Sequence, residues 1–280
     1  MTTLVTGARG KVGQAVIARL HAADLPVRAA SADPTGLTVP ADVETVEVRL
    51  DAPETFDSAL KGVGQVFLYP NPEGIDAFLT AAENAGVEHI VLLSSASVLA
   101  PDAEDDPLGS HHLVVEKALA ASDLTVTVLR PDAFASNALG WAHTIANGLP
   151  IELPYPDAQL APIHPDDIAD IAVDALTDGP VRGRTVVLTG AQPLTFREQL
   201  ALMSEVLGRD IPVTEISVEA AREQMSRHMP PPLVRSLLAY WATAAARPAM
   251  LGDTTETLLG VPARGFAQWV GENAAAFSGV

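Results

Sequence analysis

Short apolar runs alternate with stretches of helical period through the first half of the chain. The apolar runs predict buried strands at Thr3–Val5, Val27–Ala30, Thr45–Val48, Val66–Leu68, Ile90–Leu93 and Thr125–Leu129. Apolar residues three and four positions apart predict helices at Lys11–Ala22, Glu54–Leu60, Gly74–Ala85 and His111–Ala121. Near-continuous apolar strands separated by helices are typical of a parallel sheet covered on both faces. We therefore expect an α/β fold with a doubly wound parallel sheet, which binds ligands at the carboxyl ends of its strands.

The pattern changes after residue 131. Residues Ala133–Leu160 form an irregular stretch rich in Asn, Gly, Pro and aromatic residues, which is a candidate wall for a substrate. Further elements are predicted as a helix at Asp166–Leu176, a strand at Thr185–Leu188, and a helix that a capping box opens at Thr195 and Gly208 ends. The tail from Val218 to Phe277 is mostly helical and is interrupted by prolines. We expect residues 161–280 to add the last sheet elements and a small helical lobe, in one structural unit with residues 1–160.

The first predicted strand leads directly into a glycine-rich loop and a helix, and this junction predicts a nucleotide site. Gly7 permits the tight turn after the strand, Gly10 lets the backbone approach a pyrophosphate, and Gly13 removes a Cβ where helix meets strand. The pyrophosphate would lie against the amide groups at the helix start. The residues expected to bind the cofactor here are Thr6, Gly7, Arg9, Gly10, Lys11, Val12 and Gly13.

Composition narrows the classes of partner. The 280 residues carry 17 basic and 35 acidic side chains, a formal charge of −18, which repels phosphate backbones and anionic lipid. The chain has no cysteine, so disulfides and thiolate chemistry are excluded. The first strand starts within three residues of the N-terminus, and no apolar run approaches the ~20 residues of a membrane span. We expect a cytoplasmic protein with a small-molecule substrate and with no nucleic acid, membrane or metal.

Several segments follow one another in the order of a known family. They are the loop Thr6–Gly13, Val48–Asp51 with Ala59–Val63, Val66–Pro70, Val91–Ser95, Thr127–Pro131 and His164–Ala169. Together they resemble the NmrA-like group of atypical short-chain dehydrogenases, which includes triphenylmethane reductase and quinone reductases. The resemblance spans nearly the whole chain and implies a Rossmann fold that binds NAD(P). It also implies that Asp51 lies on the adenine side and that the loop at Pro70 faces the cofactor.

The catalytic pair of ordinary short-chain dehydrogenases is missing. That pair is a tyrosine, which donates a proton, and a lysine four residues later on the same helix. None of the three tyrosines has a lysine four positions on, and the resemblance places His112 and Glu116 at the two positions. Two interpretations are open. In one, His112 is an acid/base group or orients the substrate, and Glu116, one turn on, raises its basicity; in the other, both are ordinary polar residues of a helix.

Other candidates lie at strand ends and in the irregular stretch. Ser94 and Ser95 end a central strand, so either one hydrogen-bonds ribose or substrate, or its hydroxyl only ties off the strand. We group Ser94 with the cofactor residues and Ser95 with the catalytic candidates. Asn137 and Trp141 are candidates for the substrate wall, although a lone tryptophan in an apolar stretch is equally a core residue. His164, which the resemblance places near the active site, is a substrate candidate or a helix cap.

The residues give conflicting indications of the cofactor's ribose. Asp33 follows Gly13 by 20 residues, where a carboxylate that holds the 2′-hydroxyl of NAD is expected. Relatives that use NADP often carry arginine near the position of Ala32. In the opposite sense, Arg9 and Lys11 in the loop are suited to a 2′-phosphate. NAD and NADP both stay open, with a slight preference for NAD.

These features favour an NAD(P)-dependent oxidoreductase that acts on a conjugated or aromatic small molecule, such as a quinone or a polyketide-like ring. Hydride addition to such an acceptor needs less help from a strong proton donor than reduction of a ketone, which agrees with the missing pair. Two alternatives are open. One is a tailoring monooxygenase that acts on an aromatic polyketide with the same fold, and the other is a non-catalytic NAD(P) redox sensor that acts through a protein partner.

Overall fold

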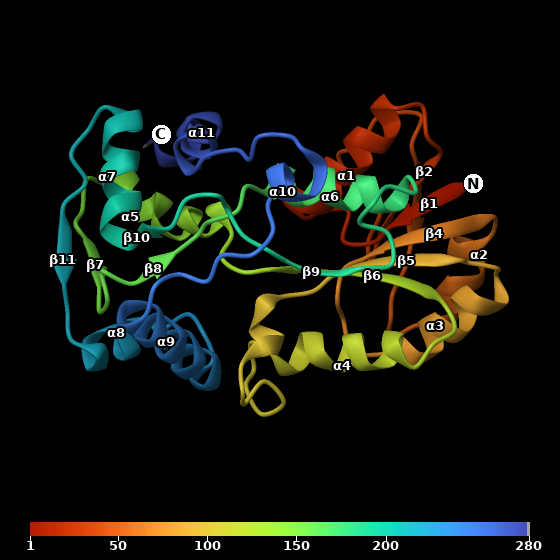
Figure 1. Ribbon diagram of the computed structural model, residues 1–280, viewed down its shortest axis with the longest axis horizontal. Helices are drawn as coiled ribbons and strands as arrows, with labels where there is room; N and C mark the ends of the chain where they lie inside the picture. The colour runs from red at the N-terminus through yellow and green to blue at the C-terminus, as the bar shows by residue number, and fades with distance from the viewer. Residues whose placement is uncertain (279–280) are drawn as a thin grey trace.

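A seven-stranded parallel sheet forms the centre of the computed structural model, which describes residues 1–278 (Figure 1). Its strands are β1 (Thr2–Val5), β2 (Val27–Ser31), β3 (Glu44–Glu47), β4 (Val63–Leu68), β5 (His89–Leu93), β6 (Thr125–Pro131) and β9 (Thr185–Leu188). They lie in the order β3-β2-β1-β4-β5-β6-β9. The chain changes direction across the sheet between β1 and β4, so a crevice opens outside their carboxyl ends. The predicted doubly wound Rossmann fold is confirmed.

Helices cover both faces of this sheet (Figure 1). On one face, α1 (Lys11–Ala22) and α6 (Pro165–Leu176) bury their apolar sides in a shared core cluster. On the other face, a second cluster joins the sheet to three helices, which are α2 (Phe56–Leu60), α3 (Ile75–Asn84) and α4 (Ser110–Ala120). Two short 3-10 helices, η1 (Pro53–Thr55) and η2 (Ala96–Leu99), follow the ends of β3 and β5. The local period of apolar residues predicts this region well because each helix packs one stripe on the sheet.

The remaining elements form a helical lobe beside the sheet, on the left of Figure 1. They are η3 (Ala135–Trp141), α5 (Ala142–Ala146), β7 (Ile151–Leu153), β8 (Gln159–Leu160), β10 (Leu194–Thr195), α7 (Phe196–Leu207), β11 (Val213–Glu215), α8 (Val218–Met225), α9 (Pro231–Ala246), α11 (Phe266–Glu272) and η4 (Ala274–Phe277). Many of them share one core cluster, which includes Phe196, Trp269 and Phe277. A further helix, α10 (Thr255–Leu259), instead contacts α6 of the sheet region.

The stretch predicted to be irregular, residues 133–160, contains regular structure. Its strand β8 pairs antiparallel with β10, and β7 pairs parallel with β11. These ladders are only two and three residues long, and their partners lie far along the chain. Such pairings leave no local period in the sequence, so the prediction missed them. Within residues 1–278, no helix combines the length and apolar character needed to cross a membrane.

Candidate functional site

The glycine loop between β1 and α1 is shaped by close backbone contacts. Gly7 has a φ of +64°, and a Cβ there would lie 2.8 Å from the Cβ of Tyr69. A Cβ on Gly13 would lie 2.5 Å from the carbonyl oxygen of Gly7. The Thr6 hydroxyl accepts from the Tyr69 amide at 2.7 Å and donates to the Phe67 carbonyl at 3.2 Å. These contacts hold the end of β1 against the end of β4 and permit only glycine at both loop positions.

The start of α1 is open to an anion. Gly10 is the N-cap, no side chain caps the helix, and its first turn holds no acidic residue. A cavity of roughly 540 Å³ opens in front of it, within the usual range for small-molecule sites. The cavity is lined by Thr6, Gly7, Ala8, Arg9, Gly10, Ala30, Ser31, Ala32, Val48, Arg49, Leu50, Asp51, Leu68, Tyr69, Asn71 and Glu73. A glycine cradle beside a free helix start fits the pyrophosphate and adenosine of a dinucleotide.

At the end of β2, Arg9 rather than Asp33 lines this cavity. The Asp33 carboxylate accepts from the hydroxyl and amide of Thr35 at 2.5 and 2.9 Å, and these bonds lower the pKa of Asp33. Arg9 donates to the carbonyls of Asp33 and Thr35 at 2.6 and 2.9 Å, and to the Ser31 hydroxyl at 3.3 Å. The residue expected to select NAD therefore stabilises its own turn, while a guanidinium reaches the cavity.

The other predicted cofactor residues lie around this cavity in different ways. Asp51 lines it and pairs with Arg49 at 2.9 Å, and the hydrogen bond from Arg49 lowers the pKa of Asp51. Lys11, Val12 and Gly13 form the first turn of α1 and are not among its lining residues. Pro70 and Ser94 also lie outside the lining. The cavity thus covers the adenosine and pyrophosphate end of the expected cofactor position.

Glu116 is held by neighbours other than His112. Arg130, on β6, donates from Nε and Nη2 to the two carboxylate oxygens at 3.0 and 2.5 Å, and the Ser94 hydroxyl donates at 2.5 Å. The Glu116 side chain is only 9% exposed, so this pair is largely withdrawn from water. The expected pairing of Glu116 with His112 is not formed, because the bidentate guanidinium is the stronger partner. No local sequence pattern marks Arg130 as a partner of this helix.

The two adjacent histidines of α4 have different surroundings. The exposed His111 is hydrogen-bonded through Nε2 to the Pro70 carbonyl at 3.2 Å, which ties α4 to the loop after β4. Within the described chain, Nδ1 of His112 is buried and has no hydrogen-bond partner. Burial lowers the pKa of His112 to about 4, with His111 acting in the same direction. His112 is therefore a neutral imidazole near pH 7.

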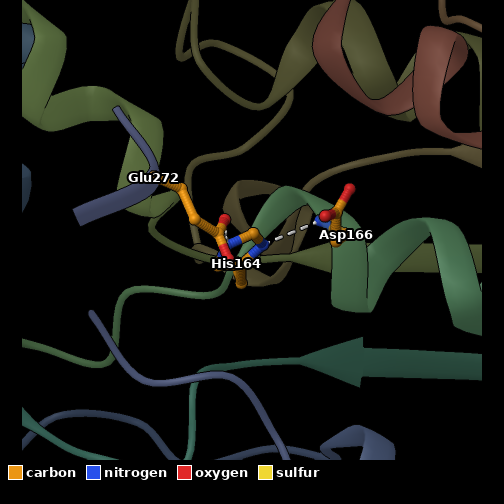
Figure 2. Close-up of side chains that lie close together, drawn as sticks. All are labelled: His164, Asp166 and Glu272. Atoms are coloured by element: carbon orange, nitrogen blue, oxygen red, sulfur yellow. Dashed lines mark hydrogen bonds and ion pairs between the residues drawn. The ribbon is translucent and has the colours of Figure 1, made fainter. Parts of the chain in front are cut away.

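Ser95 and His164 both act as caps in this structure. The Ser95 hydroxyl oxygen accepts from the amide and the hydroxyl of Ser97 at the start of η2, at 3.2 and 2.9 Å. Figure 2 shows His164 between Asp166 and Glu272. Its Nδ1 accepts from the Asp166 amide at 3.1 Å, which caps α6, and its Nε2 lies 2.9 Å from a Glu272 oxygen. Their catalytic and substrate roles stay predictions.

The cluster in Figure 2 also has the ligand types of a metal site. Potential ligand atoms of His164, Asp166 and Glu272 lie within 4.8 Å of one another. Both ring nitrogens of His164 already have partners, however, and an ion would have to displace the helix cap or the Glu272 carboxylate. The donor set is therefore better explained as a link between α6 and α11.

Part of the predicted substrate wall, residues 133–160, belongs to the hydrophobic core of the lobe. Asn137 is exposed on η3, while Trp141 packs edge-on against Phe196 with ring centroids 5.8 Å apart. A contact that the sequence analysis missed lies nearby, where the Tyr240 hydroxyl donates to the Asp132 carboxylate at 2.8 Å. Burial raises the pKa of both groups above their ordinary values. The one feature of the sequence that points to Asp132 is its place directly after a predicted strand.

Comparison with known proteins gives the site a chemical context. The sequence profile of the NAD(P)H-binding family matches residues 7–179. The chain is 38% identical over 281 residues to (4-alkanoyl-5-oxo-2,5-dihydrofuran-3-yl)methyl phosphate reductase of Streptomyces griseus, covering 98% of this chain and 99% of that protein. It is 31% identical over 288 residues to NAD(P)H azoreductase of Xenophilus azovorans, covering 98% of each. In fold it resembles Citrobacter sp. triphenylmethane reductase complexed with NADP(H), with a TM-score of 0.81, 23% identity, and coverage of 98% and 100%.

Proposed function

The chain belongs to the NAD(P)H-binding family and is an NAD(P)H-dependent reductase of NmrA-like type, and from this premise we propose that it reduces a conjugated or aromatic small molecule. The Streptomyces griseus relative is named for an alkanoyl-substituted oxo-dihydrofuran, and the Xenophilus azovorans relative for azo compounds. In each kind of acceptor, a double bond is conjugated with groups that take up developing charge. A quinone or a polyketide-like ring has the same property, and we place the substrate in this class.

The pairing of Glu116 with Arg130 and Ser94 carries this choice. It fills the lysine position of ordinary short-chain dehydrogenases with a carboxylate that is already engaged. The tyrosine position holds His112, and Lys117, one residue past the lysine position, pairs with Glu104. An acceptor that delocalises the charge left by hydride addition places a smaller demand on the proton donor. The site therefore suits a conjugated acceptor better than an isolated carbonyl.

We assign the reduced nucleotide to the cavity along the glycine loop, and when bound it supplies the hydride. The backbone of residues 6–13 holds the pyrophosphate, and Asp51 lies at the adenine side. Pro70 and Ser94 lie toward the nicotinamide end, at the ends of neighbouring strands. Asn137, Trp141 and His164 are the candidate substrate residues. In this proposal His112, Glu116 and Ser95 orient the reactants, because Glu116 is bonded to Arg130 and Ser94 and burial lowers the pKa of His112.

At the 2′ position of the adenosine ribose we propose the phosphate of NADP(H), whereas the sequence slightly favoured the hydroxyl of NAD. Arg9 lines the cavity beside Ser31, and both are suited to a 2′-phosphate. The Asp33 carboxylate, which would repel that phosphate, is neutralised in part by Arg9 at 3.6 Å and is turned to Thr35. A ratio of kcat/KM for NADPH over NADH above about 10 supports this choice, and a ratio below 1 contradicts it.

The proposed activity is tested by anaerobic assay. Purified protein is mixed with NADPH and a panel of quinones, an alkanoyl butenolide and an azo dye, and nucleotide oxidation is compared with product formation. We expect stoichiometric turnover with at least one acceptor, and none in Gly10→Val, whose added side chain blocks the pyrophosphate. Product that forms only with oxygen would favour the monooxygenase. Nucleotide binding without turnover of any acceptor would favour the sensor and contradict the reductase.

A further inference from the structure

A carboxyl group and a phenol meet where the sheet touches the helical lobe. Asp132 directly follows β6, and its amide still donates to the Leu188 carbonyl of β9 at 3.0 Å. Tyr240, on α9, donates its hydroxyl to Oδ1 of Asp132 at 2.8 Å. Both side chains are half-buried. This contact joins the ligand-binding edge of the sheet to the lobe, and the function described so far does not use it.

Asp132 has no cationic partner in the described part of the chain, in contrast to Glu116 and Asp167. Glu116 pairs with Arg130, and Asp167 pairs with Arg264. Among the ion pairs formed within residues 1–278, none includes Asp132. A carboxyl withdrawn from water with no cation is favoured in its neutral form. Burial accordingly raises the pKa of Asp132, and only hydrogen bonds from Tyr240 and the Ala133 amide oppose it.

Asp132 directly follows the last residue of β6, at the carboxyl edge of the sheet. Two residues earlier, on β6 itself, the guanidinium of Arg130 holds Glu116 of α4. Ser94, at the end of the neighbouring strand β5, joins the same hydrogen-bonded group. Asp132 thus stands at the carboxyl edge of the sheet, one strand away from Ser94, the residue that we proposed to lie toward the nicotinamide.

We propose that Asp132 donates the proton in the reduction and that Tyr240 is its positioning residue. The inference rests on the reductase activity proposed above. Burial and the neighbouring carboxyl raise the pKa of Tyr240, so the phenol keeps its proton and acts only as a hydrogen-bond donor. It fixes the direction in which the carboxyl faces the substrate. A carboxyl group whose pKa is raised by burial can serve as a general acid in an enclosed site.

The step balances with the cofactor as reductant. The hydride carries two electrons from the reduced nicotinamide to one end of the conjugated acceptor, and negative charge develops on the heteroatom at the other end. The O–H bond of Asp132 breaks, and its proton forms an O–H or N–H bond with that heteroatom. The Asp132 carboxylate remains hydrogen-bonded to Tyr240 and regains a proton from water. The nicotinamide is oxidised, the acceptor is reduced, and one solvent proton is consumed.

Two variants separate the roles of the pair. Asp132→Asn keeps the shape but has no acidic proton, so we expect kcat with a neutral quinone to fall at least ~100-fold. Hydride transfer to a cationic triphenylmethane dye gives a neutral product without any proton. Asp132→Asn should therefore retain dye reduction within about threefold. Asp210→Asn, which changes an exposed carboxylate of the lobe, is the matched control and should leave both activities unchanged.

The second variant tests Tyr240 through the pH profile. Wild-type kcat with the quinone should fall as pH rises through the pKa of Asp132, because the acid form is required. Tyr240→Phe removes a hydrogen bond that favours the carboxylate, so this limb should move up by about one pH unit. Thr243→Val, which removes an exposed hydroxyl from the same helix as Tyr240, is the control and should leave the limb in place.

An infrared titration supplies a readout without nucleotide or substrate. The protonated carboxyl band of Asp132, identified by its loss in Asp132→Asn, should titrate above the ordinary range of aspartate and higher still in Tyr240→Phe. Unchanged quinone turnover in Asp132→Asn, or equal loss of quinone and dye reduction with nucleotide affinity intact, would overturn the proposal. So would an Asp132 carboxyl that titrates below pH ~4. A wild type that reduces no acceptor overturns the proposed function instead, and the titration then still reports on the pair.

Discussion

At the residue scale, the site is defined by which charges find partners. Glu116 meets Arg130 and Ser94, Asp33 meets Thr35, and Asp132 meets only hydrogen-bond donors. The three carboxyl groups therefore have three different environments. Burial and the neighbouring donors decide how far the charged form of a carboxyl group is favoured. The glycine loop depends on no charge pairing, because its conformation is set by the close approach of neighbouring atoms to Gly7 and Gly13.

Arg9 is expected to discriminate between the two nicotinamide cofactors. In Arg9→Ala the 2′-phosphate loses a charge-assisted partner, so KM for NADPH should rise at least ~10-fold while KM for NADH changes less than ~3-fold. Initial rates with a common quinone measure both constants. Arg197→Ala removes an exposed arginine of the lobe and should change neither. Equal effects of Arg9→Ala on both cofactors would contradict the assignment of the ribose end.

His112 is expected to matter little for proton transfer. Burial lowers its pKa to about 4, so at pH 7 it carries no proton to give as an imidazolium. His112→Asn should therefore leave the alkaline limb of the pH profile in place, while lost orientation lowers kcat with the quinone by less than about tenfold. Steady-state kinetics over pH 5–9 check both points. A loss of tenfold or more, together with loss of that limb, would return the donor role to His112.

At the element scale, a buried polar group lies at the amino ends of the central strands, opposite the proposed nucleotide site, and contributes to stability. His89, the first residue of β5, is fully buried and bonds Thr127 of β6 at 2.8 Å, Arg182 at 2.9 Å and Gln65 of β4 at 3.3 Å. Three neighbouring strand positions are thereby linked through one imidazole. Burial, with Arg182 in the same direction, lowers the pKa of His89 to about 4.

This histidine should make the fold sensitive to acid. The unfolded chain binds a proton near pH 6.5, whereas folded His89 does so only near pH 4, so stability present above pH 6.5 is lost as pH falls toward 4. The loss from His89 amounts to about 3 kcal/mol. Urea unfolding of His89→Gln should show a shallower decline over that range, whereas His228→Gln, at an exposed position, should follow the wild type. Equal slopes for wild type and His89→Gln would contradict this.

At the scale of the whole molecule, the segment before α11 returns to α6 through a buried ion pair. Arg264 bonds the Asp167 carboxylate and Asp170, the latter at 2.6 Å, and its backbone amide also donates to Asp167 at 2.9 Å. The Asp167 side chain is only 1% exposed. Together with His164 and Glu272, this pair fixes the C-terminal part of the chain to the sheet region. Asp170 of α6 also pairs with Arg19 of α1 at 2.5 Å, and the two helices share a core cluster, so we propose that residues 1–160 and 161–280 unfold as one unit.

Arg264→Leu tests that proposal. It leaves the Asp167 charge buried without its cation, and the free energy of unfolding at pH 7 should fall by about 3 kcal/mol or more. The deficit should shrink as pH is lowered, because without Arg264 the folded-state pKa of Asp167 lies further above its unfolded value and a protonated carboxyl is less costly to bury. Calorimetry should show a single shifted transition. Two separate transitions would argue for independent units, and Arg227→Leu, in an exposed pair, should change stability by less than ~1 kcal/mol.

The sequence by itself determined the alternation of strands and helices, the glycine loop and the absence of the tyrosine–lysine pair. These features are local, since a helix face, a buried strand and a tight turn each leave a pattern within a few residues. The tertiary structure alone decided that Glu116 meets Arg130, that Arg9 and not Asp33 lines the cavity, and that Tyr240 reaches Asp132 across 108 positions of the chain. Charge pairing and burial depend on which elements pack together, and the pKa of a catalytic group follows from that packing.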